Sequence, residues 1–224
     1  MIVLTAKSPL LIVSAMVVLI SAAQSVIAAQ KVAESATRVC PLLVGSEVPK
    51  LELRDLQGEA KTLAAELDGK PTAIVFYRGG WCPFCNLQLG QLQQALPQLR
   101  ELGVQVVGIT PDPPGALRAV TSKFELEYSL LSDSDMAAAK AFGVAYRLDD
   151  ETIARYQQYE IFMQDSAGNP RYQLPVPAVF LVNSAGLIEF SYVNPDPRVR
   201  IEPELLLVAA RGVVRRGAEN SVAP

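Results

Sequence analysis

Two cysteines, Cys82 and Cys85, stand between a short apolar run rich in β-branched residues and a segment with helical spacing. The run, 72–77, is typical of a strand buried on both faces, because parallel strands covered by helices are almost continuously apolar. Pro83 suits the first helical position, where its missing N–H costs nothing. A helix start has unpaired N–H groups and partial positive charge, which favour thiolate over thiol. A Cys-x-x-Cys pair at this junction therefore predicts a redox-active thiol centre.

Strands and helices are expected to alternate along the remaining chain. Strands are predicted at 51–53 (as an edge strand), 104–109, 129–131, and in a hairpin of 178–182 and 187–193. Helices are predicted at 62–67 (one turn), 83–102 (kinked at Pro97), 116–124, a segment ending at Phe142 and capped by Ser134 or Asp135, and 202–211. This order predicts an α/β or α+β three-layer sandwich.

Composition narrows the function classes. The chain has 224 residues, enough for one domain with a substantial core. It has no histidine, which excludes Ser-His-Asp and Cys-His catalysis, and three cysteines alone do not supply the four ligands of a structural zinc site. The formal net charge is −3 with no long basic stretch, so no nucleic-acid partner is expected.

The first residues have the pattern of a targeting segment. Lys7 precedes an apolar stretch at 9–20, and small residues follow at 21–23 and 26–28. We expect 1–29 to be a signal peptide, with an uncleaved anchor as the alternative, and 30–41 to be a tether. Export to a bacterial periplasm is the predicted destination, and the leader is the sole expected contact with a membrane.

The folded domain is predicted at 42–211. Residues 143–174, which contain several tyrosines and fit no simple element, are interpreted as an insertion. The end of the chain, 212–224, is interpreted as a solvated tail.

The stretch 77–86, Tyr-Arg-Gly-Gly-Trp-Cys-Pro-Phe-Cys-Asn, resembles the thioredoxin-like superfamily, and more narrowly the peroxiredoxin-like branch of the alkyl hydroperoxide reductase and thiol-specific antioxidant family. A proline-strand-turn segment at 174–186 supports the resemblance, which covers roughly 42–211. It implies a thioredoxin-like three-layer sandwich with a central mixed β-sheet. It also implies a cis peptide at Val176–Pro177, lying against the two sulfurs.

The chain departs from the peroxiredoxin pattern at three positions. Where those enzymes have a proline and a Thr or Ser before the reactive cysteine, Val75 and Gly79 stand here. The arginine that they place at the start of the downstream strand aligns with Pro177. Peroxidase activity then requires Arg78 or another arginine to take over the role of the missing groups, which polarise the peroxide in those enzymes.

Cys82 is the expected nucleophile, at the helix N-cap and more exposed and more acidic than Cys85, which is expected to resolve the intermediate. Arg78 is the nearest cation, and Trp81 and Phe84 are expected to wall the site. Cys40 is interpreted as a lone thiol, with pairing between subunits after export as the alternative. Asp112 is interpreted as a turn or capping residue, although the preceding strand directs it to the same sheet edge as the thiols.

Three functions remain open. The first is a peroxiredoxin-like antioxidant enzyme that reduces hydroperoxides through Cys82 and Cys85 and is regenerated by an external dithiol, such as a thioredoxin-like protein. The second is a thioredoxin-type protein disulfide reductase, with the substrate held against Pro177. The third is a non-catalytic exported binding domain that keeps a structural disulfide. No metal, flavin or nucleotide is predicted.

Overall fold

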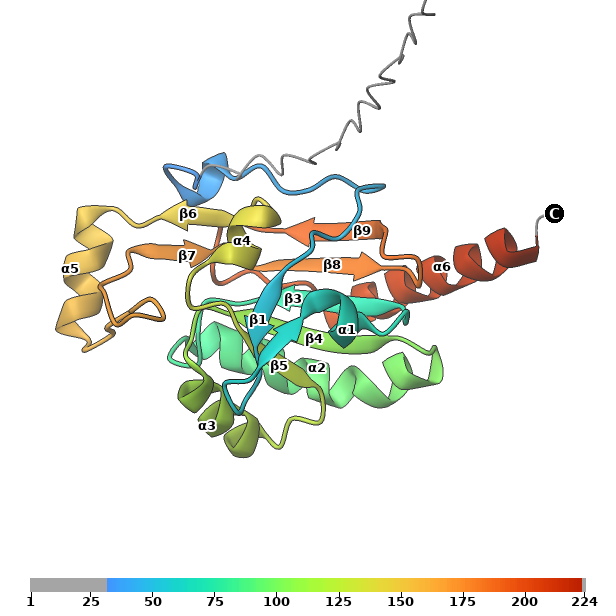
Figure 1. Cartoon of the computed structure of the whole chain (residues 1–224), viewed down its shortest axis with the longest axis horizontal. Coiled ribbons are helices and arrows are strands. Elements are labelled where there is room, and N and C mark those ends of the chain that lie inside the picture. The colour runs from blue at the N-terminus through green and yellow to red at the C-terminus, as the bar shows by residue number, and fades with distance from the viewer. Residues whose placement is uncertain (1–31, 223–224) are drawn as a thin grey trace, which may run out of the picture.

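The computed structural model describes residues 32–222 and has a seven-stranded mixed sheet at its centre (Figure 1). The strand order is β2-β1-β5-β4-β3-β8-β9. The strands are β1 (Glu52–Arg54), β2 (Ala60–Thr62), β3 (Thr72–Phe76), β4 (Gln105–Thr110), β5 (Ser129–Ser132), β8 (Ala178–Val182) and β9 (Ile188–Val193). The pairs β3–β4 and β4–β5 are parallel and the others antiparallel. This arrangement confirms the predicted mixed sheet.

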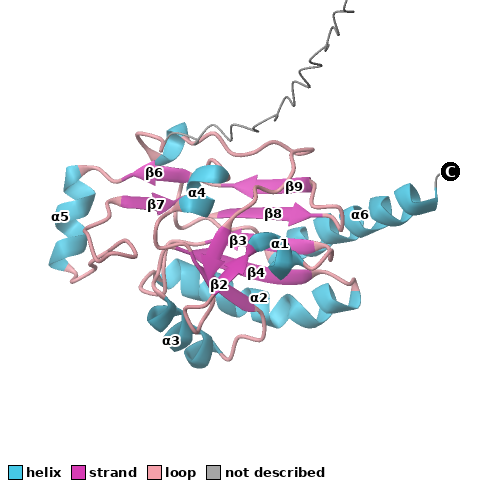
Figure 2. Cartoon of the chain, in the orientation of Figure 1, coloured by secondary structure: helices cyan, strands magenta, loops and turns pink. Residues whose placement is uncertain are grey.

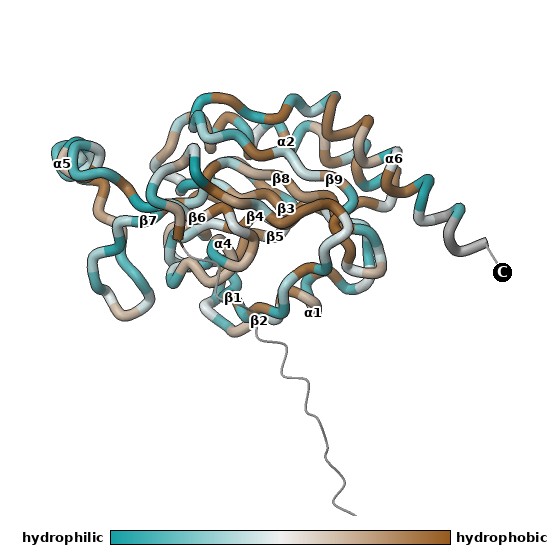
Figure 3. Tube along the Cα trace, turned by 90° about the horizontal axis from the view of Figure 1, so that it is seen from above, coloured by the Kyte–Doolittle hydropathy of each residue, from teal (hydrophilic) through white to brown (hydrophobic). Residues whose placement is uncertain are grey.

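Helices cover both faces of the sheet. Side chains of β3 alternate between two cores: Ala73 and Val75 pack with α2 (Pro83–Glu101), α3 (Pro114–Phe124) and α6 (Pro203–Val222), whereas Ile74 and Phe76 pack with α1 (Leu63–Leu67) and α4 (Ala137–Ala141). This alternation follows from the two-residue period of a strand. The apolar strands lie between the two helical layers (Figure 3), which confirms the three-layer sandwich.

The predicted insertion forms an arm beside the sheet, which we define as residues 143–175. Its strands β6 (Ala145–Arg147) and β7 (Gln173–Pro175) pair antiparallel, and α5 (Asp150–Gln158) stands at its outer end (Figure 2). In the described part of the segment expected to be a tether, 32–41, the chain contacts this arm. Ala33 forms a parallel bridge with Tyr146, and a short 3-10 helix, η1 (Ala36–Arg38), follows.

Several predicted details of individual elements are wrong. Strand β1 is not at the edge, because β2 pairs outside it. Helix α4 is capped neither by Ser134 nor by Asp135. The carboxylate of Asp133 accepts the N–H groups of Ala138 and Ala139 instead, at 2.9 and 2.8 Å. Helix α6 continues to Val222, through most of the predicted tail, since the segment has no proline before Val222 and accommodates Gly212 and Gly217.

The Val176–Pro177 peptide is trans, like every other peptide bond among the described residues. Trans is the lower-energy form of an X–Pro bond, so the implied cis peptide is a wrong expectation.

The predicted leader lies outside the described residues. Within 32–222, no helix combines the length and the apolar character needed to span a bilayer.

Candidate active site

The cysteines lie where β3 passes into α2. Cys82 is the N-cap of α2, with extended backbone angles (φ −89°, ψ 116°), and Pro83 is the first helical residue. The carbonyl of Cys82 accepts the N–H groups of Cys85 and Asn86 at 3.1 and 3.0 Å, which closes the first turn. Cys85 therefore lies one turn into the helix, on the same side as Cys82.

Asp112 fixes the loop that leads into α2. Because β3 and β4 are parallel, their carboxyl ends meet at one edge of the sheet, and Oδ2 of Asp112 accepts the N–H of Gly80 at 2.6 Å. Gly79 has a positive φ of 154°, and a Cβ there would lie 2.8 Å from Oδ1 of Asp112. Burial raises the pKa of this carboxyl, while the Gly80 N–H opposes the rise. Asp112 is thus part of the site's framework, a role beyond the predicted turn.

Two arginines reach the sulfurs. Nη1 of Arg78 lies 3.8 Å from Sγ of Cys82, and Nη2 of Arg200 lies 3.3 Å from Sγ of Cys85. Sequence reasoning missed Arg200, which stands 115 positions after Cys85 in the loop between β9 and α6. The buried side chain of Ile201, 3% exposed, anchors that loop in the core.

The two thiols differ sharply in acidity. The pKa of Cys82 is lowered to about 5, first by a hydrogen bond from the Cys85 thiol and then by the Cys85 backbone N–H and the charges of Arg78 and Arg200, against the opposing effect of burial. Burial and the neighbouring Cys82 raise the pKa of Cys85 well above its ordinary value. At neutral pH, Cys82 is a thiolate and Cys85 a thiol, which is the predicted order of acidity.

The expected difference in exposure is absent. Cys82 is 1% exposed and Cys85 is 0% exposed, and both pack in the core cluster on the α2 face of the sheet. Burial by itself raises the pKa of a thiol. The acidity of Cys82 therefore comes from the charges and hydrogen bonds around its sulfur and not from contact with solvent.

Aromatic side chains cover Arg78. Its guanidinium carbon lies 5.0 Å from the ring centre of Trp81 and 5.7 Å from that of Tyr156. The two rings meet edge to face at 5.3 Å. Tyr156 comes from α5 in the arm, so it packs against the site itself. Phe84 is 40% exposed, on the first turn of α2.

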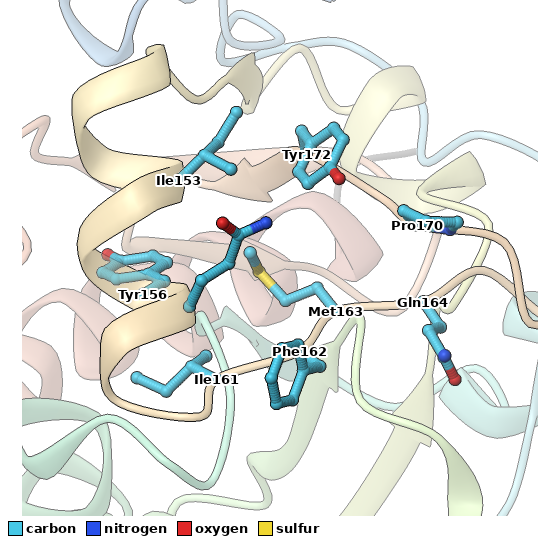
Figure 4. A pocket seen from close by; sticks show the side chains of 9 residues that line it. Ile153, Tyr156, Ile161, Phe162, Met163, Gln164, Pro170 and Tyr172 are labelled. Atoms are coloured by element: carbon cyan, nitrogen blue, oxygen red, sulfur yellow. The ribbon is translucent and has the colours of Figure 1, made fainter.

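Two cavities flank Tyr156. The first, which we call the arginine pocket, has a volume of about 360 Å³. It is lined by three arginines (Arg78, Arg147 and Arg155), by Tyr146 and Tyr156, by the segments 34–37 and 148–149, and by Thr152, Pro195 and Pro197. The second, of about 180 Å³, lies between α5 and the loop 161–172 and is mostly apolar (Figure 4). It contains neither a thiol nor a charged side chain, so it is not a place for the redox chemistry.

The remaining candidates lie apart from the sulfurs or at the margin of the site. Ala178 pairs with Phe76, so Pro177 stands next to Tyr77 at the same sheet edge, and its carbonyl accepts the N–H of Asn194 at 3.1 Å. Cys40 is exposed in the N-terminal segment. The structure therefore brings together Cys82, Cys85, Arg78 and Trp81, as predicted, and adds Arg200, Asp112 and Tyr156.

Comparison with known proteins gives a family. The model of the AhpC/TSA family matches residues 44–191. Peroxiredoxin Bcp of Escherichia coli (strain K12) is 35% identical over 104 residues, which are 46% of this chain and 66% of that protein. Chloroplastic peroxiredoxin Q of Gentiana triflora is 32% identical over 100 residues, 45% of this chain and 46% of that protein. The match thus spans between about half and just under two thirds of these relatives' length.

Solved structures share the fold. Peroxidoxin BcpB from Mycobacterium tuberculosis aligns with a TM-score of 0.59 and 20% identity, over 77% of this chain and 96% of that one. Reduced Prx3 from Vibrio vulnificus, in complex with H2O2, aligns with a TM-score of 0.61 and 16% identity, over 75% of this chain and 96% of that one. These similarities establish a thioredoxin-like fold. Together with the family match over more than half its length, they show that the chain belongs to the AhpC/TSA family.

Proposed function

We propose that the protein is a thiol-dependent peroxidase, an antioxidant oxidoreductase that reduces hydroperoxides with Cys82 and Cys85. The Cys82 thiolate attacks the terminal oxygen of a hydroperoxide, ROOH. An S–O bond forms and the O–O bond breaks, which oxidises the sulfur to sulfenic acid. The departing alkoxide takes a proton from solvent and leaves as the alcohol, ROH.

Cys85 completes the oxidative half of the cycle. Its sulfur attacks the sulfur of Cys82, an S–S bond forms, and the S–O bond breaks. The hydroxide leaves with the proton of the Cys85 thiol as water. An external dithiol, for which a thioredoxin-like protein is the proposed source, then reduces the disulfide by exchange and is itself oxidised.

The observation that carries this proposal is the arrangement of the sulfurs at the start of α2, where Arg78 lies 3.8 Å from Sγ of Cys82 and Arg200 lies 3.3 Å from Sγ of Cys85, one helical turn away. This arrangement agrees with a pKa of Cys82 lowered to about 5 and a raised pKa of Cys85. Thiolate is the reactive form, and a cation near the breaking O–O bond stabilises the charge that develops on the leaving oxygen. Arg78 and Arg200 thereby offer cationic substitutes for the two polar groups that the sequence lacks at Gly79 and Pro177. The names of the relatives, peroxiredoxin Bcp and peroxiredoxin Q, agree with this chemistry.

Protein disulfide reduction is the second candidate, favoured by the Cys-x-x-Cys spacing. Two observations support a small oxidant instead. Cys82 is 1% exposed, so a protein disulfide cannot reach its sulfur unless the surrounding side chains move. The trans peptide before Pro177 does not present the cis-proline surface that the thioredoxin resemblance implied.

One experiment separates the candidates. Reduced protein is mixed with hydrogen peroxide or cumene hydroperoxide, and the thiols at Cys82 and Cys85 are followed by differential alkylation and mass spectrometry. Rapid loss of both thiols with formation of their disulfide is expected. Reduction of insulin without peroxide consumption would assign the protein to disulfide reduction, and inactivity toward both would favour a binding domain.

A further inference from the structure

The arginine pocket is too large for hydrogen peroxide alone. A molecule of liquid water occupies about 30 Å³, so a cavity of about 360 Å³ has room for roughly a dozen non-hydrogen atoms. This volume lies within the range of small-molecule binding sites. A ligand that fills the pocket is therefore an organic molecule of moderate size.

The charges in the pocket favour an anion. Arg78, Arg147 and Arg155 line it, and within residues 32–222 no carboxylate lies within 4.0 Å of any of their guanidinium nitrogens. The acids in the lining are Glu34 and Asp149. The carboxylate of Asp149 accepts the Thr152 N–H at 2.7 Å and caps α5; this hydrogen bond and the charge of Arg155 lower the pKa of that carboxyl. Three arginines against two carboxylates leave the lining with an excess of one positive charge.

Arg78 connects this pocket to the reactive sulfur. Its side chain is buried, only 7% exposed, and its Nε has no hydrogen-bond partner among the described residues. Arg78 lines the pocket, and its Nη1 lies 3.8 Å from Sγ of Cys82. Arg147 and Arg155, by contrast, are exposed and come from the arm. Arg78 therefore joins the pocket to the nucleophile, which is not itself in the lining, and the other cations of the pocket come from a surface element.

We propose that the arginine pocket binds organic hydroperoxides that carry a carboxylate, with the hydroperoxide group toward Arg78 and Cys82 and the carboxylate toward Arg147 and Arg155. This inference rests on the proposed peroxidase function and names its substrate class. Each guanidinium offers a planar pair of donors that matches the two oxygens of a carboxylate. The arm then acts as a selectivity element for chemistry that is performed at the sheet edge.

The kinetic test compares two peroxides that differ by one charge: cumene hydroperoxide and its para-carboxylate derivative. In the wild type, kcat/KM is expected to be higher for the carboxylate. In the double variant Arg147→Gln/Arg155→Gln, the ratio of the two kcat/KM values should fall about tenfold, because the variant lacks both guanidinium groups that pair with the carboxylate. Arg215→Gln, at an exposed arginine on α6, should keep the wild-type ratio.

Salt gives a second kinetic reading. The preference for the carboxylate should weaken as ionic strength rises, because exposed charges are screened. Equal kcat/KM for both peroxides in the wild type, or an unaltered ratio in the double variant, would overturn the inference while leaving the peroxidase function intact.

A binding test does not depend on activity. Trp81 is the only tryptophan in the chain and packs on Tyr156, which lines the pocket. Titration with para-isopropylbenzoate should change Trp81 fluorescence at concentrations about tenfold lower than with the neutral para-isopropylbenzamide, and the double variant should lose this difference. If no peroxide is consumed but the carboxylate still binds selectively, the proposed function fails and the anion site stands. If both ligands bind alike, the anion site fails.

Discussion

The site is assembled from two parts of the molecule that differ in how they are held. The sheet-edge part, residues 77–85 with Asp112, follows strands whose residues are almost all buried. The arm contributes Tyr146, Tyr156 and two arginines from elements at the surface, and α5 has no buried residue. The sheet edge therefore has the rigidity that positions reacting atoms, whereas the arm can vary without disturbing them. We infer that chemistry resides in the first part and ligand choice in the second.

The largest expected effect is at the sulfurs. Cys82→Ser should reduce peroxide consumption to background, about a thousandfold or more, because the hydroxyl is a far weaker nucleophile at neutral pH. Cys85→Ser should still react once with peroxide, but the product should stop at the sulfenic acid of Cys82. Trapping with dimedone and mass spectrometry distinguishes the two. Dimedone labelling of Cys85 in the Cys82→Ser protein, at the wild-type rate, would reverse the assigned roles.

A second prediction concerns the charge beside Cys82. The alkylation rate of the reduced wild type should rise with pH to half its maximum near the pKa of about 5, because only the thiolate reacts. Arg78→Gln removes a cation that favours the thiolate, so the midpoint should move to higher pH, and peroxide reduction at neutral pH should fall about 10–100-fold. The measurement is iodoacetamide labelling of Cys82 across the pH range.

The hydrogen bond from Cys85 is the largest of the effects that lower the Cys82 pKa. Cys85→Ala should consequently raise the midpoint further than Arg78→Gln does. Arg215→Gln serves as the control and should leave the midpoint in place. If the Arg78→Gln variant has the same midpoint as the wild type, Arg78 does not contribute to the acidity of the Cys82 thiol.

Much of the sheet-edge part could be predicted from the sequence, because its signals are local. An apolar run, a Cys-x-x-Cys pair, a proline at the first helical position and a glycine-rich approach stand within fifteen residues. For Asp112 the sequence favours a turn or capping role, and it is the parallel pairing of β3 with β4 in the structure that places this residue at the same edge. The local pattern did not reveal that both cysteines are buried, because the segments that pack around them are distant in sequence.

The arm and Arg200 could not be predicted, because their positions depend on long-range packing. Arg200 reaches Cys85 only after β8, β9 and a loop with two prolines have brought it back to the start of α2. Residues 143–174 form short strands that are stabilised by each other and by Ala33, and α5 has little apolar surface to mark it. Neither region has a periodic pattern long enough to be recognised without its partners.

A third prediction tests the tight approach of the loop to Asp112. Gly79→Ala places a methyl group against Asp112 and Trp81 at a backbone angle that favours glycine, so we expect a loss of about 1–3 kcal/mol in the free energy of unfolding. Gly90→Ala is the matched control: it lies inside α2 with open space around it, and should stabilise the protein by about 0.5–1 kcal/mol. Urea denaturation followed by circular dichroism measures both. If the two substitutions have equal effects on the free energy of unfolding, the loop accommodates the added methyl group at little cost.

The smallest expected effect lies in the arm. Tyr156→Ala removes the edge-to-face contact with Trp81 and one of the two aromatic rings over Arg78, which together are worth about 0.5–1.5 kcal/mol. Because α5 is exposed, we expect a change in the free energy of unfolding at the low end of that range, and a red shift of Trp81 fluorescence as water reaches the ring. The rate of reaction with hydrogen peroxide should change by less than about threefold, since Tyr156 contacts neither sulfur. A loss as large as that of Arg78→Gln would show that the arm positions the reacting groups, and the division between a catalytic sheet edge and a selective arm would have to be abandoned.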